Sequence, residues 1–139
     1  MVTKRVWLML VAMLVMPVTA AACGMGEKVA EGYENTEVKH AHQHWNQGAS
    51  SAVPFVFIDV RTPEEYAENH IEGATLIPVQ ELAERINEVP KDKQVYVYCR
   101  SGKRSAQAAT ILAKAGYTNV ENVLGGITAW KDANYPVVK

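Results

Sequence analysis

A cysteine in the second half of the chain lies beside residues that would make its sulfur reactive. Cys99 follows the apolar run 94–98, and the residues after it are Arg100, Ser101, Gly102, Lys103 and Arg104. Cations, and the unpaired N–H groups at the start of a helix, both favour a thiolate over a thiol. Such cysteines have pKa values of about 3.5 to 7.5 instead of roughly 8.5. The spacing therefore predicts a nucleophilic cysteine in an anion-binding loop.

The loop also contains a residue that suits it to bending around an anion. Gly102 lets successive backbone N–H groups point at one anionic group. The alternative is a structural cysteine that ends a core strand and is followed by solvated basic residues. Three cations among the five residues after Cys99 argue against that alternative.

The segments around this loop alternate between apolar runs and amphipathic stretches. Apolar runs without alternation indicate strands buried on both faces, as in a parallel sheet covered by helices. We predict strands at 55–59, 74–77, 94–98 and 119–123, and helices at 36–47, 62–69, 79–89, 105–115 and 127–133. Thr36 and Thr62 are the expected caps of the first two helices. This order predicts an α/β fold with Cys99 at the carboxyl end of a strand, where such folds bind ligands.

Composition and spacing exclude several classes of function. The chain has 139 residues, 48% hydrophobic and 21% charged, which fits one globular domain with a packed core. Its formal net charge of −1 gives no reason to expect a nucleic-acid partner. His40, His42 and His44 suggest a metal site, but no cysteine or acidic residue lies at zinc-site spacing from them. We therefore expect no bound metal.

The loop and its flanking segments resemble the rhodanese family of sulfurtransferases. Cys99 to Ser105 matches the pattern C-R-x-G-x-R-S of its single-domain members at every fixed position. Further similar blocks are Ile58-Asp59-Val60-Arg61 with Glu65-Tyr66, His70 to Ala74, and Leu124-Gly125-Gly126 with Trp130 and Pro136. The resemblance covers about 36–138. It implies a five-stranded, mostly parallel sheet with helices on both faces.

The resemblance also implies an activity, that of a thiosulfate sulfurtransferase. In that family the cysteine takes a sulfane sulfur from a donor such as thiosulfate, holds it as a persulfide, and passes it to a thiophilic acceptor such as cyanide or a thiol. We therefore expect Cys99 to be catalytic and residues 100–104 to bind substrate, with no cofactor and in a monomer. A sulfur-carrier or protein-interaction module with incidental turnover is the alternative.

Two further expectations concern residues near the loop. Tyrosine-phosphatase-like enzymes need an arginine six residues after the cysteine, whereas here Arg104 comes five residues after it and Ser105 six. The sequence thus argues against a phosphatase or an arsenate reductase.

Asp59 ends a predicted strand and Arg61 follows it closely. The resemblance implies that the two residues pair and position the loop. Sulfur transfer from a preformed thiolate needs no general base.

The first residues have the pattern of a secretory signal peptide. Lys4 and Arg5 precede the apolar run 6–18, and small residues follow at 19–22. The apolar run is shorter than the roughly 17 to 25 residues of a bilayer span. We expect cleavage after Ala20 or Ala22 and export to a bacterial periplasm. A signal peptide at 1–22 would then precede a flexible leader at 23–35 and a rhodanese-like domain at 36–139.

Cys23 suggests a second way in which the N-terminal segment is processed, as the signal of a lipoprotein. The run Ala20-Ala21-Ala22-Cys23-Gly24 resembles a bacterial lipoprotein box, in which the cysteine is acylated and anchors the protein to the membrane. Ala20 departs from that pattern because leucine is more usual there. The sequence leaves both routes open. If Cys23 is acylated, Cys99 is the only free thiol of the mature protein, which avoids an internal disulfide in an oxidising compartment.

Overall fold

Apolar segments from across the chain form neighbouring strands of one sheet. The computed structural model describes residues 26–139. The strands are β1 (Glu27–Lys28), β2 (Glu34–Thr36), β3 (Phe55–Asp59), β4 (Thr75–Leu76), β5 (Gln94–Tyr98) and β6 (Val120–Val123). They form a six-stranded sheet in the order β1-β2-β6-β5-β3-β4, and only β1 and β2 pair antiparallel. Because β3 and β5 pair with Asp59 opposite Tyr98, their carboxyl ends lie level with each other.

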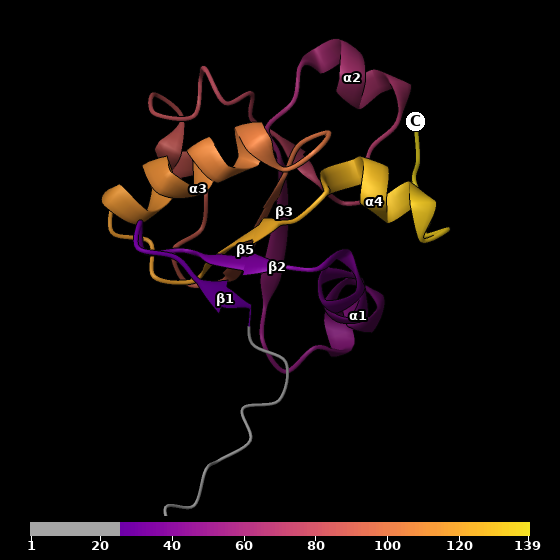
Figure 1. Ribbon diagram of the computed structural model, residues 1–139, viewed down its shortest axis with the longest axis horizontal. Helices are drawn as coiled ribbons and strands as arrows, with labels where there is room; N and C mark the ends of the chain where they lie inside the picture. Colours follow the sequence, from indigo (N-terminus) through magenta and orange to yellow (C-terminus); the bar gives the residue numbers. More distant parts are fainter. Residues whose placement is uncertain (1–25) are drawn as a thin grey trace, which may run out of the picture.

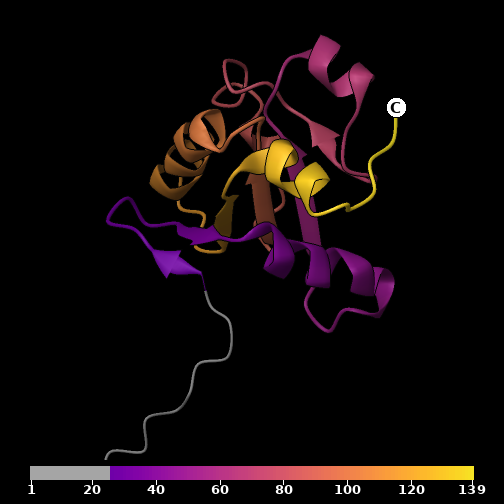
Figure 2. The same cartoon turned by 45° about the vertical axis from the view of Figure 1, so that its right-hand side comes forward.

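Helices cover both faces of this sheet, as the apolar strands predicted. They are α1 (Val38–Gln47), α2 (Pro63–Glu68), α3 (Lys103–Lys114) and α4 (Gly126–Asp132), with short 3₁₀ turns η1 (Gly48–Ser50) and η2 (Ile86–Glu88). Ala108 and Leu112 of α3 pack with the side chains on one face. Ala41 of α1 and Trp130 of α4 pack with those on the other face (Figures 1 and 2). The α/β fold with two covered faces is confirmed.

The sheet has one strand more than the five predicted, because part of the expected leader pairs with it. β1 and the first two residues of β2 fall within the segment 23–35 that we expected to be a flexible leader. β2 pairs with β6, and the Asn122 side-chain amide donates to Asn35 Oδ1 at 2.9 Å. Tyr33 is also buried. The local sequence did not indicate these strands, because β1 and the first two residues of β2 are polar and belong to types that are depleted in strands.

The helix predicted at 79–89 was wrong. The segment consists of turns followed by the single 3₁₀ turn η2. Its buried residues Leu82 and Val89 produce a helix-like spacing, although their side chains simply fill the core. The Tyr117 hydroxyl lies 2.9 Å from the Ile86 carbonyl oxygen and 2.6 Å from that of Val89. Ile86 and Val89 belong to the last turn of the predicted helix, where backbone carbonyl groups have no partner within a helix, so a side chain from a distant segment supplies one.

The two predicted helix caps had different outcomes. Thr36 ends β2, so the cap of α1 is Glu37 instead. Thr62 caps α2 as predicted: its hydroxyl accepts from the Glu65 N–H at 3.2 Å, and the Thr62 N–H donates to Glu65 Oε2 at 3.0 Å. This reciprocal arrangement is a capping box. It fixes Glu65 at the start of α2.

The signal peptide predicted at 1–22 and the lipidation site predicted at Cys23 lie outside the described residues. Among residues 26–139 we find no helix with the length and apolar character that a membrane crossing requires.

Candidate active site

Cys99 lies where the sequence predicted, directly after β5 at its carboxyl end. The residue is almost completely buried, with 1% of its surface exposed. The chain turns at Gly102, which caps α3 with a φ of 101°. A side chain is strained in that left-handed region, so glycine allows the tight turn. The start of α3 therefore follows the sulfur within a few residues.

Neutral hydrogen-bond donors surround the sulfur. The Gly102 N–H donates to Cys99 Sγ at 3.1 Å, and the Ser105 hydroxyl lies 3.4 Å from the same atom. That hydroxyl also lies 2.6 Å from Asn122 Oδ1 on β6. Asn122 in turn donates to Asn35 on β2. Side-chain hydrogen bonds thus connect the sulfur to β6 and, beyond β6, to β2.

These donors change the acidity of the thiol. Burial by itself raises the pKa of Cys99. Hydrogen bonds from the Ser105 hydroxyl and from the backbone N–H groups of Ser105, Gly102 and Ser101 more than offset that effect, so the pKa of Cys99 is lower than its ordinary value. Backbone N–H groups at a helix start stabilise an anion in this way. The arrangement favours a thiolate at Cys99.

The first turn of α4 supports the loop from the other side. The Ile127 N–H donates to the Cys99 carbonyl at 2.9 Å, and the Thr128 N–H donates to the Arg100 carbonyl at 3.2 Å. Gly126 lies between these contacts with a φ of 55°. A Cβ atom there would collide with the carbonyl groups of Cys99 and Arg100. This close approach holds the backbone on both sides of the nucleophile.

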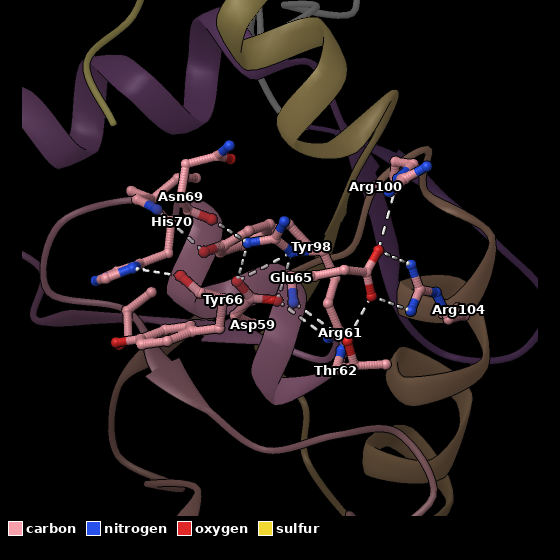
Figure 3. A network of polar contacts seen from close by, with 12 residues as sticks. Asp59, Arg61, Thr62, Glu65, Tyr66, Asn69, His70, Tyr98, Arg100 and Arg104 are labelled. Carbon is pink, nitrogen blue, oxygen red and sulfur yellow. Dashed lines mark hydrogen bonds and ion pairs between the residues drawn. The ribbon is translucent and has the colours of Figure 1, made fainter. Parts of the chain in front are cut away.

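The two arginines of the loop are turned toward a carboxylate. Arg104 donates to both oxygens of Glu65, at 2.8 and 2.9 Å, and Arg100 Nε lies 3.5 Å from Glu65 Oε1 (Figure 3). The hydrogen bonds from Arg104 are the main reason that the pKa of Glu65 is lowered to about 2. We expected the arginine charges to lower the pKa of Cys99, but neutral donors make the larger contributions, and Arg104 adds a charge interaction with the Cys99 thiolate. Arg100 keeps 65% of its side chain exposed.

The remaining predicted loop residues, Ser101 and Lys103, are exposed to solvent. Ser101 contributes its N–H group to the donors around the sulfur. Lys103 begins α3. The loop therefore presents backbone groups to the sulfur and long side chains to solvent or to Glu65.

Asp59 and Arg61 form a buried ion pair at the carboxyl end of β3. Arg61 Nη2 lies 2.6 Å from Asp59 Oδ2, and Arg61 Nε donates to Asp59 Oδ1 at 2.9 Å. The same guanidinium donates to the Asn69 carbonyl at 2.6 Å and lies over the ring of Tyr98 (Figure 3). Tyr98 immediately precedes Cys99. The pair thus positions the end of α2 and the strand that carries the cysteine.

The three histidines of α1 have contacts of other kinds. His44 Nδ1 lies 2.9 Å from the Tyr96 hydroxyl, and His42 stacks on Tyr135 with 3.7 Å between ring centroids. Over residues 26–139, no three His, Cys, Asp or Glu side chains are grouped closely enough to hold a metal ion.

The sequence interpretation missed the roles of Glu65, Ser105 and Asn122. Ser105 and Glu65 belong to the motifs quoted above, but nothing local indicates what they contact. Asn122 did carry a signal, because it is a polar residue next to Val123 in a strand predicted to be buried. A buried polar side chain in a strand requires a hydrogen-bond partner, and here the partner is the serine beside the nucleophile.

Comparison with known proteins identifies the family. Residues 38–133 match the family model described as a rhodanese-like domain. The chain belongs to the rhodanese family. It is 48% identical over 85 residues to the thiosulfate sulfurtransferase PspE of Escherichia coli, covering 60% of this chain and 78% of that protein. It is 43% identical over 83 residues to a protein named sulfurtransferase from Allochromatium vinosum, with the same shares covered.

The structural comparison agrees with this family. The rhodanese-related protein of Thermoplasma volcanium has a TM-score of 0.68 and 31% identity to this rhodanese, covering 76% of this chain and 98% of that one. The predicted rhodanese-like fold is therefore confirmed, apart from the number of strands.

The Glu65–Arg104 pair gives a test of stability against pH. The carboxyl has a pKa of about 2 in the folded protein and an ordinary value of 4.5, so its stabilising effect is fully present above pH 4.5 and is lost as the pH falls toward 2. Glu65→Gln should lower the free energy of unfolding at pH 7 by about 1 to 3 kcal/mol. Urea denaturation should show the gap to the wild type narrowing between pH 4.5 and 2.

Glu64→Gln is the matched control, because Glu64 is an exposed acid at the neighbouring position. It should change stability much less. A gap for Glu65→Gln that stays constant down to pH 2 would contradict the ion-pair explanation.

Proposed function

We propose that this rhodanese is a sulfurtransferase that carries a sulfane sulfur on Cys99. The observation that supports this proposal is the buried sulfur with a lowered pKa among N–H and hydroxyl donors. The Cys99 thiolate attacks the outer sulfur of thiosulfate or a similar donor. A new sulfur–sulfur bond forms at Cys99, the donor's own sulfur–sulfur bond breaks, and its electron pair leaves with sulfite.

The second half of the reaction regenerates the enzyme. Cyanide or a thiolate attacks the outer sulfur of the Cys99 persulfide, and the electron pair of the breaking bond returns to the Cys99 sulfur. Neither half requires an external redox partner or a general base. The donors that stabilise the thiolate also suit the persulfide, which is an anion of similar position and charge.

The contacts suggest distinct roles for the predicted substrate-binding residues. The N–H groups of Ser101 and Gly102 would hold the sulfur anion. Arg100 is exposed, and its contact with Glu65 is long, so its guanidinium is available to an incoming dianion. Arg104 is held by two hydrogen bonds to Glu65 and would mainly fix α3 against α2. Lys103 faces solvent and would have a smaller effect.

The choice of thiosulfate as donor rests on similarity to the E. coli protein named thiosulfate sulfurtransferase. The alternative is a sulfur carrier that loads Cys99 and releases the sulfur only to a particular protein.

Replacement of the nucleophile tests the mechanism directly. Cys99→Ser should abolish sulfur transfer from thiosulfate to cyanide, because a hydroxyl is a far weaker nucleophile at neutral pH and forms no persulfide. Mass spectrometry after incubation with thiosulfate should show the wild type gaining one sulfur atom at Cys99. The free energy of unfolding of Cys99→Ser, measured in urea, should differ little from that of the wild type. Transfer that survives in Cys99→Ser would refute the mechanism, whereas stable loading without turnover on cyanide would favour the carrier.

A comparison of Ser105 and Arg100 tests the division of roles within the loop. Ser105→Ala should raise the pKa of Cys99, measured as the pH dependence of thiol alkylation, because the sulfur loses a hydroxyl donor. Arg100→Ala should lower kcat/KM for thiosulfate about tenfold, the effect of losing one hydrogen bond to a charged group. It should move the alkylation pKa less than Ser105→Ala does. A larger shift of the alkylation pKa in Arg100→Ala than in Ser105→Ala would show that the arginine is the main stabiliser of the thiolate.

We also propose that the protein acts in the periplasm after export, on the strength of the signal-peptide pattern at 1–22. Protein recovered from a bacterium with a working secretion system should begin at Ala21 or Cys23, as read from the mass of the intact chain. An acylated Cys23 would identify a lipoprotein. An intact Met1 on the recovered protein would argue against export.

A further inference from the structure

A hollow of about 230 Å³ lies between the end of α2 and α4, close to the loop that follows Cys99. Its lining includes Asn69 at the end of α2, Arg100 in the loop, and Ile127, Thr128 and Lys131 of α4. Arg100 and Ile127 link the hollow to the sulfur: Arg100 follows Cys99 in the chain, and the Ile127 N–H donates to the Cys99 carbonyl. Cys99 is not itself on the lining, so a molecule in this hollow would lie beside the loop that follows the nucleophile.

The charges around the hollow favour an anion. Lys131 is exposed and forms no ion pair with any residue in the range 26–139. Arg100 has only its long contact with Glu65, a carboxylate that already binds Arg104. The charge of Arg61, which also lines the hollow, is balanced by Asp59.

One carboxylate opposes these cations. Glu68 lies on the lining at the end of α2. Over the lining and its ion-pair partners, the four cations Arg61, Arg100, Arg104 and Lys131 outnumber the three carboxylates Asp59, Glu65 and Glu68 by one, so the local balance is positive. Neutral donors make the largest favourable contributions to the thiolate, and Arg104 interacts with it by charge. Arg100 and Lys131 are exposed and are therefore available to a second anionic group.

We propose that this hollow binds the carboxylate of an anionic thiol acceptor and that Lys131 determines the preference for such acceptors. The inference rests on the sulfurtransferase function proposed above. With the carboxylate near Lys131 and Arg100, the acceptor thiolate attacks the outer sulfur of the Cys99 persulfide. A bond forms between the acceptor sulfur and the transferred sulfur, the bond to Cys99 breaks, and the electron pair returns to Cys99. The product is the persulfide of the acceptor.

Three small thiols of similar size but different charge provide the test. The enzyme is loaded with thiosulfate and freed of excess donor. It is then mixed with 3-mercaptopropionate, 2-mercaptoethanol or cysteamine, which carry a negative, a neutral and a positive group. Loss of the persulfide is followed by mass spectrometry. Each rate constant is divided by that of the wild type with the same thiol, so that differences in intrinsic thiol reactivity cancel.

Lys131→Glu should lower the rate with 3-mercaptopropionate relative to that with cysteamine by about three- to tenfold, as expected for one exposed charge reversed beside a charged ligand. Lys131→Arg should keep the wild-type preference. Lys114→Glu is the matched control, because it makes the same charge change in an exposed residue at the end of α3, away from the lining of the hollow. It should alter none of the three ratios.

Other results overturn the inference in distinguishable ways. An equal decrease with all three thiols in Lys131→Glu would indicate a structural effect, and a change equal to that of Lys114→Glu would indicate only the overall charge. A change in the rate of loading by thiosulfate, without a change in acceptor preference, would assign the hollow to the anionic donor. If thiosulfate never loads Cys99, the proposed sulfurtransferase function is wrong as well. If Cys99 is loaded but Lys131→Glu leaves the acceptor preference unchanged, only the proposal about the hollow is wrong.

Discussion

A sulfur anion buried at the end of a strand needs hydrogen-bond donors, and this need governs the arrangement of the residues around it. Burial alone raises the pKa of the Cys99 thiol, so the thiolate forms only if donors outweigh desolvation. The turn at Gly102 and the start of α3 bring three backbone N–H groups and one hydroxyl toward the sulfur. Asn122 and Asn35 then connect that hydroxyl to two strands. The group of hydrogen-bond donors around the sulfur is thus connected to the sheet.

The charged residues form a second layer, in which most charges are paired with one another. Asp59 pairs with Arg61, and Glu65 binds Arg104 while approaching Arg100. The carboxylates hold Arg61 and Arg104, and neutral donors contribute most to the acidity of Cys99, with an added charge interaction from Arg104. In the proposed function, this arrangement leaves Arg100 and Lys131 to bind substrates. A substitution that affects binding therefore need not affect the acidity of Cys99.

The parallel arrangement of the strands explains why the donors around the sulfur and the paired charges lie close together. Since Asp59 of β3 lies opposite Tyr98 of β5, the buried ion pair and the cysteine lie at the same edge of the sheet. The capping box of α2 places Glu65 at that edge as well. One side chain therefore caps a helix, binds Arg104, and approaches Arg100 beside the nucleophile. Loss of Glu65 would affect helix stability and loop geometry together.

The sequence by itself determined the features that depend on neighbouring residues. The strand before Cys99, the glycine turn, the helix after it and the cap at Thr62 all follow from local preferences and hydrophobic spacing. Tertiary structure decided the rest. Arg104 binds a carboxylate 39 residues away, β2 pairs with β6 from the other end of the chain, and the turns of 79–89 are held to the core by buried Leu82 and Val89 and by the Tyr117 hydroxyl. Local patterns contain no information about such partners, because contacts between distant residues form only when the whole chain packs.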